Sequence, residues 1–278
     1  MRSVLITGAS TGIGRATALK MDASGWRVFA GVRREQDAEA LRGAASERLV
    51  PLLLEITDQE QITVAVEEIA AVTGESGLDG LVNNAGITIP CPLELLPLDD
   101  LRRLFEVNLI GQLAVTQALL PQLRASRGRV VFVSSISSRR AVPFLAAYSA
   151  SKSGLSAIAD GLRQELRSWQ VDVSLVEPGL IETPMWDRGE KEFDSVLERS
   201  SADTDALYGS AIASFRKLAD QALSRRISPQ KVVAAIEHAL IARRPRTRYL
   251  VGLDARGQAF ALRFMPDRAI DFAVARLM

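Results

Sequence analysis

Tyr148 and Lys152 are the two side chains in this sequence best suited to proton transfer. They stand four residues apart in a stretch of helical periodicity, so both side chains lie on one face of the expected helix. A free tyrosine has a pKa of about 10 and is a poor base at neutral pH, but a nearby ammonium favours the phenolate. Such a tyrosine can serve as general acid or base on an alcohol or carbonyl oxygen. The alternative is an aromatic residue beside a solvated lysine.

Ser135 offers a hydroxyl group near the same chemistry, because it follows the fifth expected strand and comes thirteen residues before Tyr148. Ligands of parallel sheets bind at the carboxyl ends of the strands. A serine there can hydrogen-bond a substrate oxygen as negative charge develops on it. Ser134 is the neighbouring alternative.

A glycine-rich turn, Thr7-Gly8-Ala9-Ser10-Thr11-Gly12-Ile13-Gly14, lies between the first expected strand and a helix. Glycines let the backbone turn sharply and approach a pyrophosphate closely. The helix that follows offers free N–H groups and a partial positive charge. The spacing G-x-x-x-G-x-G differs from the G-x-G-x-x-G of many dinucleotide folds, but the position after a strand predicts nucleotide binding. A purely structural turn is the alternative.

The composition excludes several other kinds of active site. The 278 residues include one histidine, His238, and one cysteine, Cys91. A Cys/His zinc cluster and an internal disulfide are therefore excluded, and we expect no metal site. Lys and Arg number 34 against 33 Asp and Glu, a net charge of +1, so we expect no nucleic-acid partner. The N-terminal apolar run is too short for a signal peptide, and no stretch approaches the roughly 18–20 apolar residues that span a bilayer. We therefore expect a cytoplasmic protein without a transmembrane segment.

Short apolar runs typical of strands alternate with longer stretches of helical period. The expected strands, the seventh less clearly marked than the others, are Ser3–Ile6, Arg27–Val32, Leu49–Ile56, Leu78–Asn83, Arg129–Ser134, Val171–Glu177 and Arg248–Gly252. The expected helical stretches are 13–24, 35–46, 58–73, 99–126, 148–169 and 229–243. This alternation predicts an α/β fold with a doubly wound parallel sheet between two helical layers, as one domain over 1–278.

Two segments depart from this alternation. Residues 184–228 form an insertion that is locally acidic, with seven acids against three bases between Met185 and Asp205. Its apolar residues predict either a lid over a lipophilic alcohol or ketone, or a helical hairpin with its own small core. Residues 253–278 predict an amphipathic helical pair broken at Pro266, which covers a subunit, docks on the core or touches a membrane surface.

Four motifs, in order along 2–252, resemble the short-chain dehydrogenase/reductase family. They are Thr7–Gly14, Asn83-Asn84-Ala85-Gly86, Ser135 with Tyr148-x-x-x-Lys152, and Pro178-Gly179 followed by Thr183. The resemblance, which points to the single-domain branch, implies a Rossmann-type sheet. It also implies hydride transfer to or from a nicotinamide, the hydride chemistry being the cofactor's own.

The same resemblance implies a catalytic tetrad. Tyr148 acts as the general acid or base. Lys152 lowers the pKa of Tyr148 and binds the ribose, and Ser135 orients the substrate oxygen. Asn108 holds a water that links to Lys152, unless it is an ordinary polar residue of its helix.

Cofactor contacts are implied at the ends of the strands. Besides Tyr148 and Lys152, the implied cofactor residues are Gly8, Ser10, Thr11, Gly12, Ile13, Gly14, Arg33, Arg34, Glu55, Ile56, Asn83, Ala85, Gly86, Pro178, Gly179, Ile181 and Thr183. Glu55 stands where the family usually has an aspartate that contacts the adenine. Asn83 and Gly86 are expected on the adenosine and ribose side, and Ile181 and Thr183 at the nicotinamide carboxamide.

The end of the second expected strand favours NADP(H) over NAD(H). Folds that bind NAD place an acidic residue near this point for the ribose 2′-hydroxyl, whereas a 2′-phosphate prefers arginine. Val32 occupies the expected acid position, and Arg33 and Arg34 follow it. A planar guanidinium can bind phosphate through two hydrogen bonds. Some NADP-type members also carry a basic residue inside the glycine turn, where this sequence has Thr11.

The sequence therefore predicts an NADP(H)-dependent oxidoreductase that interconverts an alcohol and its ketone or aldehyde. Gly31-Val32-Arg33-Arg34 and Glu177-Pro178-Gly179 resemble members that act on retinol or hydroxysteroids, which suggests a steroid-, retinoid- or lipid-like substrate. A 3-ketoacyl thioester reductase and a non-catalytic nucleotide-binding regulatory protein are the alternatives. The resemblance further implies a homodimer or homotetramer assembled through the helices at 99–126 and 148–169.

Overall fold

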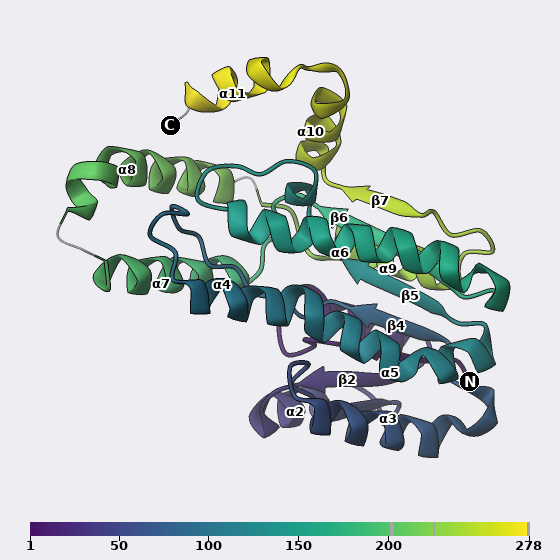
Figure 1. The fold of residues 1–278 in the computed structure, drawn as a ribbon. Helices are drawn as coiled ribbons and strands as arrows, with labels where there is room; N and C mark the ends of the chain where they lie inside the picture. Colours follow the sequence, from purple (N-terminus) through teal and green to yellow (C-terminus); the bar gives the residue numbers. More distant parts are fainter. Residues whose placement is uncertain (201–202, 225, 277–278) are drawn as a thin grey trace.

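Residues 1–200, 203–224 and 226–276 are described in the computed structural model of the chain. Their strands form a parallel sheet in the order β3-β2-β1-β4-β5-β6-β7 (Figure 1). The strands are β1 (Ser3–Ile6), β2 (Arg27–Val32), β3 (Leu49–Leu53), β4 (Gly80–Asn83), β5 (Arg129–Val133), β6 (Asp172–Pro178) and β7 (Arg248–Val251). The predicted doubly wound sheet is confirmed, and its order reverses between β1 and β4.

Helices follow the strands where the periodicity predicts them. They are α1 (Gly12–Ala23), α2 (Glu35–Arg42), α3 (Gln59–Thr73), α4 (Leu98–Phe105), α5 (Gly111–Ser126), α6 (Ala146–Glu165), α7 (Met185–Glu198), α8 (Thr204–Leu223), α9 (Gln230–Ile241), α10 (Leu253–Phe264) and α11 (Asp267–Ala275). The helix expected over 99–126 is interrupted by a π-helical turn, Glu106–Ile110, between α4 and α5.

Four strands, β3, β4, β5 and β7, are shorter than predicted, and β3 differs most. The apolar run that begins at Leu49 predicts a strand to Ile56, but β3 ends at Leu53. Leu54, Glu55 and Ile56 leave the sheet and line a cavity at its edge. Apolar character alone does not mark the point where a buried strand becomes a buried loop.

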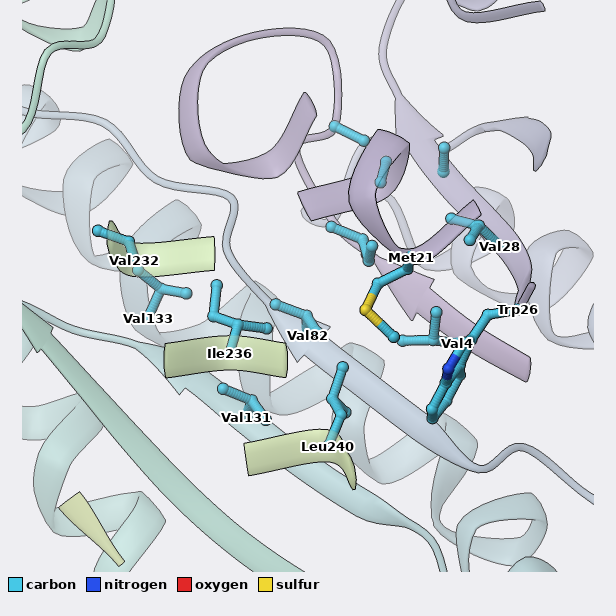
Figure 2. Close-up of a cluster of buried hydrophobic side chains, with 14 of the residues drawn as sticks. Val4, Met21, Trp26, Val28, Val82, Val131, Val133, Val232, Ile236 and Leu240 are labelled. Atoms are coloured by element: carbon cyan, nitrogen blue, oxygen red, sulfur yellow. The ribbon is translucent and has the colours of Figure 1, made fainter. Parts of the chain in front are cut away.

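Each face of the sheet is covered by its own layer of helices. Helices α1, α2 and α9 pack on one face, in a core that contains Met21, Trp26 and Ile236 (Figure 2). Helices α3, α5 and α6 pack on the other face, around Phe29, Phe132 and Leu119. Strands that are apolar on both faces require this arrangement. Polar groups that face a ligand must therefore come from the edges of the sheet.

The inserted segment leaves the sheet and returns at paired residues, because Ile181 and Ile227 form a parallel bridge. Its described residues form α7 and α8, which lie beyond the carboxyl ends of the strands (Figure 1). The C-terminal segment forms α10 and α11 with Pro266 between them, as predicted. Residues 201, 202, 225, 277 and 278, which belong to these two expected segments, lie outside the described residues.

The expectation that no stretch is long and apolar enough to cross a membrane is wrong by length and composition, since the helical run Leu98–Ser126 of the described residues meets that criterion. Its most apolar 18-residue window has a mean hydropathy of 1.2. The criterion rests on length and composition, which core helices also satisfy. Here the α5 part packs against α3 and β4, α4 packs against α6, and 39% of the apolar window is buried in the fold.

Replacement of Gly14 by alanine tests how closely α1 approaches the sheet. A Cβ atom at Gly14 would lie 2.2 Å from the Gly8 carbonyl oxygen and 2.5 Å from Asn84 Nδ2. We expect Gly14→Ala to lower the free energy of unfolding by about 1–3 kcal/mol through overpacking, although alanine favours helix. Urea denaturation measures this loss.

Gly43→Ala is the matched control for this substitution. A Cβ atom at Gly43, where φ is −70°, would approach the Glu39 carbonyl oxygen no closer than 3.6 Å. We expect it to be neutral or slightly stabilising. Equal losses for the two variants would contradict the close approach at Gly14.

Candidate active site

The glycine turn has the shape that its sequence predicts. Gly8 and Gly12 adopt φ values of +63° and +56°, in the left-handed region that favours glycine. Thr11 is the N-cap residue of α1, but its hydroxyl does not cap the helix. The N-terminus of α1 therefore opens onto the cavity with free main-chain N–H groups.

The turn is held in place by Asn84, which follows β4. Asn84 Nδ2 donates to the carbonyl oxygens of Thr7 and Gly8 at 2.9 and 3.1 Å, and Thr7 Oγ1 accepts the main-chain N–H of Asn84. The prediction that Asn83 lines the cofactor site is not borne out by its position. Asn83 is fully buried, and its Nδ2 donates to Thr116 Oγ1 at 2.8 Å. Successive side chains of a strand point to opposite faces, so Asn84 lines the cavity and Asn83 faces α5.

Tyr148, Lys152 and Ser135 meet in the same cavity. Tyr148 is 9% exposed and Lys152 is 2% exposed. Lys152 Nζ lies 6.0 Å from the centroid of the Tyr148 ring. The i, i+4 spacing on α6 brings the two together, and the end of β5 supplies the serine.

Burial dominates the pKa values of both residues, so the predicted lowering of the Tyr148 pKa by Lys152 is not observed. Burial raises the pKa of Tyr148 to about 12, while a hydrogen bond with the Ser135 side chain acts in the opposite direction. Burial lowers the pKa of Lys152 to about 8. The ammonium donates to the Val133 carbonyl oxygen at 3.0 Å. Tyr148 is therefore protonated at neutral pH. Lys152 is positively charged at neutral pH and loses this charge as the pH rises above about 8.

Asn108 lies in the π-helical turn between α4 and α5 and is fully buried. Its Oδ1 accepts the Ile87 N–H at 2.8 Å, and its Nδ2 donates to the Ile87 carbonyl oxygen at 2.9 Å and to Ser151 Oγ at 3.0 Å. A Cβ atom at Gly86 would lie 3.2 Å from Asn108 Oδ1 and 3.5 Å from Lys152 Nζ. The side chain of Asn108 therefore fixes the loop after β4 close to Lys152. That Asn108 holds a water stays a prediction.

The two arginines after β2 diverge. Arg33 lines the cavity, with a side chain that is 61% exposed, and its Nη1 lies 3.7 Å from Glu55 Oε2. Arg34 precedes the first residue of α2, and its Nε lies 3.0 Å from Asp37 Oδ2, outside the cavity. Arg34 therefore does not line the cavity, and its contact with the cofactor stays a prediction.

The turn after β6 is braced by the C-terminal segment. Pro178, Gly179, Ile181 and Thr183 line the cavity as predicted. Asp254 in the first turn of α10 also lines it, and its Oδ2 accepts the Leu180 N–H at 2.8 Å. The C-terminal segment thus contributes directly to the wall of the site.

A buried ion pair holds the Ser135 loop against β6. Glu177 is fully buried, and its carboxylate accepts hydrogen bonds from Arg139 Nε and Nη2 at 3.0 and 2.7 Å. Arg248 Nη1 in β7 adds a third contact at 3.3 Å. Two cations on one carboxylate compensate its desolvation.

The inserted segment divides its apolar residues between two roles. Met185 and Trp186 line the cavity, and Trp186 Nε1 donates to the Ile181 carbonyl oxygen at 3.0 Å. Phe193 instead packs against Phe144 and Phe215, in an aromatic cluster beside the cavity. The predicted apolar wall and the predicted small core are therefore both present.

Most of the predicted site residues line this one cavity. They are Gly8, Ser10, Thr11, Gly12, Ile13, Arg33, Glu55, Ile56, Ala85, Gly86, Ser135, Tyr148, Lys152, Pro178, Gly179, Ile181 and Thr183. Gly14, Arg34, Asn83 and Asn108 do not line it, and Gly14 packs beneath Gly8 instead. Sequence reasoning missed Asn84, Arg188, Asp254 and Gln258. Asn84 had a signal, since it lies inside the motif after β4.

The single cysteine and the single histidine lie outside the cavity lining. Cys91 packs with Ile89 and Leu104, and burial raises the pKa of its thiol to about 11. His238 Nδ1 lies 2.9 Å from the Tyr249 hydroxyl. The described residues hold no group of histidine, cysteine and acidic side chains suited to a metal ion. Tyr148, Lys152 and Ser135 are the side chains of the cavity best suited to proton transfer.

The family model described as short chain dehydrogenase matches residues 2–193. This stretch holds the glycine turn, the segment after β4 and the Ser135, Tyr148 and Lys152 constellation. The chain belongs to the short-chain dehydrogenase family.

Two relatives and one solved structure agree with this assignment. The chain is 40% identical to Retinol dehydrogenase 16 from Homo sapiens over 96% of this chain and 86% of that protein. It is 35% identical to an NADPH-dependent 3-dehydrocapnine reductase from Ornithobacterium rhinotracheale, over 98% of this chain and 95% of that protein. A short-chain dehydrogenase from Streptomyces avermitilis has the same fold, with a TM-score of 0.78, 30% identity and coverage of 99% and 94%. The protein is thus an oxidoreductase that acts on CH–OH groups with a nicotinamide cofactor.

The pH dependence of stability tests the burial of Lys152. Below pH 8 the native state must bury an ammonium that the unfolded chain exposes, so Lys152→Met should raise the free energy of unfolding. The folded pKa lies below the unfolded one, so the wild type regains this stability as pH rises from about 8 towards the unfolded pKa of about 10.5. We expect a gain of up to about 3 kcal/mol at pH 7 that falls below about 1 kcal/mol at pH 10. Urea unfolding at both pH values measures it, and an equal gain at both would contradict the shifted pKa.

Proposed function

We propose that this protein is an NADP(H)-dependent enzyme that interconverts a lipophilic alcohol and its ketone or aldehyde. The observation that carries the cofactor choice is Arg33, an exposed guanidinium that lines the cavity where β2 ends. An acid at this point would favour the 2′-hydroxyl of NAD(H), and an arginine favours a 2′-phosphate. The NADPH dependence of the 3-dehydrocapnine reductase supports the same choice.

The residues of the cavity fit a nicotinamide dinucleotide. Gly8 and Gly12 line the cavity at the N-terminus of α1, where free N–H groups suit a pyrophosphate, and Gly86 lies beside Lys152. The cofactor, when bound, supplies or accepts the hydride. Ile181 and Thr183 line the cavity beyond the turn after β6, where they would meet the nicotinamide.

Proton transfer falls to Tyr148. Because burial raises its pKa to about 12, the hydroxyl is protonated at neutral pH and can donate to a carbonyl oxygen as that oxygen becomes an alkoxide. Ser135 lies beside it and donates a hydrogen bond to the same oxygen. The positive charge of Lys152 stabilises the tyrosinate that remains. In carbonyl reduction Tyr148 would donate its proton, and in the reverse reaction the tyrosinate would accept the proton of the alcohol.

The apolar wall of the cavity supports a lipophilic substrate. Val142, Leu145, Met185 and Trp186 line it near Tyr148. Burial of apolar substrate surface against such side chains contributes about 25 cal/mol per Å². The similarity to a retinol dehydrogenase supports this class of substrate.

We also propose that the chain assembles as a homodimer or homotetramer through α5 and α6. Ala150, Ser153 and Ala157 are exposed on one side of α6, where small residues allow close packing of a second helix. Ala159, a fourth small residue of this helix, is buried in the core instead. Sedimentation at several concentrations tests the proposal, which a monomer at all of them would contradict. The cytoplasmic location stays a prediction.

Tyr148→Phe tests the mechanism. Loss of the hydroxyl should lower turnover with NADPH at least about 100-fold, because the group that donates the proton in the proposed mechanism is removed. Cofactor affinity should change little. A panel of retinoids, steroids, aliphatic ketones and acyl thioesters measures turnover, and NADPH fluorescence measures binding. Tyr249→Phe, which removes a hydroxyl that contacts His238 outside the cavity, is the control. Full activity of Tyr148→Phe would overturn the mechanism.

Arg33→Ala tests the cofactor choice, with Arg34→Ala as its neighbour-matched control. We expect wild type to bind NADPH more tightly than NADH, and Arg33→Ala to lose at least about tenfold in NADPH affinity while NADH affinity changes little. Arg34→Ala should leave both affinities unchanged, because Arg34 pairs with Asp37. Titration of fluorescence gives the dissociation constants. Equal affinities for the two cofactors in wild type would defeat the assignment.

A further inference from the structure

Arg188, in the first turns of α7, reaches from the inserted segment to the glycine turn. Its Nη2 donates to Thr11 Oγ1 at 2.9 Å, and its Nε donates to the Pro184 carbonyl oxygen at 3.2 Å. Arg188 and Thr11 both line the cavity. The guanidinium thus lies beside Thr11, the N-cap residue of α1, although 177 positions separate the two residues.

The charge of Arg188 is not neutralised by the part of the chain that the structure describes. Its guanidinium donates hydrogen bonds to a hydroxyl and a carbonyl oxygen, and it forms no ion pair with the described residues. The other two cations of the cavity are differently placed. Arg33 faces Glu55, and Lys152 is buried beside Tyr148.

The surroundings of this guanidinium suit an anion. The N-terminus of α1 carries a partial positive charge and free N–H groups at the same turn. The Thr11 hydroxyl, which leaves α1 uncapped, accepts from Arg188 instead. A planar guanidinium beside a helix N-terminus presents several donors to one phosphate group.

We infer that Arg188 binds the pyrophosphate of the nicotinamide cofactor and thereby fastens α7 onto the glycine turn when the cofactor is bound. This inference rests on the proposed function. The glycine turn carries Thr11 and no basic residue before Gly12. Arg188 supplies a cation to this turn from the inserted segment. It also makes the segment that holds Met185 and Trp186 respond to the cofactor before the substrate arrives.

Dissociation constants of NADPH and NADH test the inference. Both cofactors carry the pyrophosphate, so Arg188→Gln should weaken both by about tenfold or more, and by similar factors. Arg188→Lys should recover part of the loss, since it restores the charge without the planar fork. Lys191→Gln removes the same charge from the same helix at an exposed position outside the cavity lining, and should leave both constants unchanged.

Hydrogen exchange of α7 provides a readout that does not depend on turnover. We expect NADPH to slow exchange over 185–198 in wild type and in Lys191→Gln, and to have little effect there in Arg188→Gln. Matching thermal unfolding of the three proteins shows that the substitution has not disturbed the fold.

The outcomes separate this inference from the proposed function. A wild type that binds neither cofactor would defeat the proposed function itself. If wild type and Arg188→Gln bind NADPH equally tightly, only the inference is defeated. Weakening of NADPH without weakening of NADH would also overturn it, because the contact would then be to the 2′-phosphate.

Discussion

Burial of both faces of the sheet is the constraint on which the rest of this structure depends. The strands are apolar on each side, so two helical layers must cover them, and polar groups can reach a ligand only from an edge. Because all the strands run parallel, their carboxyl ends meet at one edge. The glycine turn after β1, Arg33 after β2 and Ser135 after β5 therefore converge, although they lie far apart in the sequence. The reversal of strand order between β1 and β4 opens this edge to a nucleotide.

Two buried charges at this edge differ in the partners that compensate them. The Glu177 carboxylate is contacted by Arg139 and Arg248, so its desolvation is compensated and it links the loop after β5 to β6 and β7. The Lys152 ammonium has a single recorded acceptor, the Val133 carbonyl oxygen, and no recorded carboxylate partner among the described residues. A buried cation without a counter-ion destabilises the free protein. The same charge lies 6.0 Å from the centroid of the Tyr148 ring, so in the proposed mechanism the tyrosinate would relieve this destabilisation.

Much of the fold and site can be predicted from the sequence, and the exceptions have physical causes. Apolar runs locate the strands, although β3 ends before its run does, and spaced motifs place Tyr148 and Lys152 on one helix face. Asn83 was assigned in place of Asn84 because the motif does not show which of two neighbouring side chains faces the cavity. A shift of one residue in a strand exchanges its faces. Similarly, Arg34 follows Arg33 but pairs within α2.

The contributions of Arg188 and Asp254 had no local signal at all. Arg188 meets Thr11 across 177 positions, and Asp254 meets Leu180 across 74. Such contacts depend on how the inserted and C-terminal segments pack, which periodicity cannot supply.

Segment charge is a poor guide to the field inside the cavity. The inserted segment is acidic over 185–205, which suggests repulsion of a phosphate. Two of its acids pair with arginines, Glu192 with Arg103 of α4 and Asp194 with Arg216 of α8, and neither acid lines the cavity. The charged residue that this segment turns towards the glycine turn is Arg188. An effect of charge on a ligand falls with distance and with solvent screening, so the residue that faces the ligand outweighs the sum over the segment. The acidic insertion therefore places the Arg188 guanidinium at the glycine turn, where a phosphate group would bind.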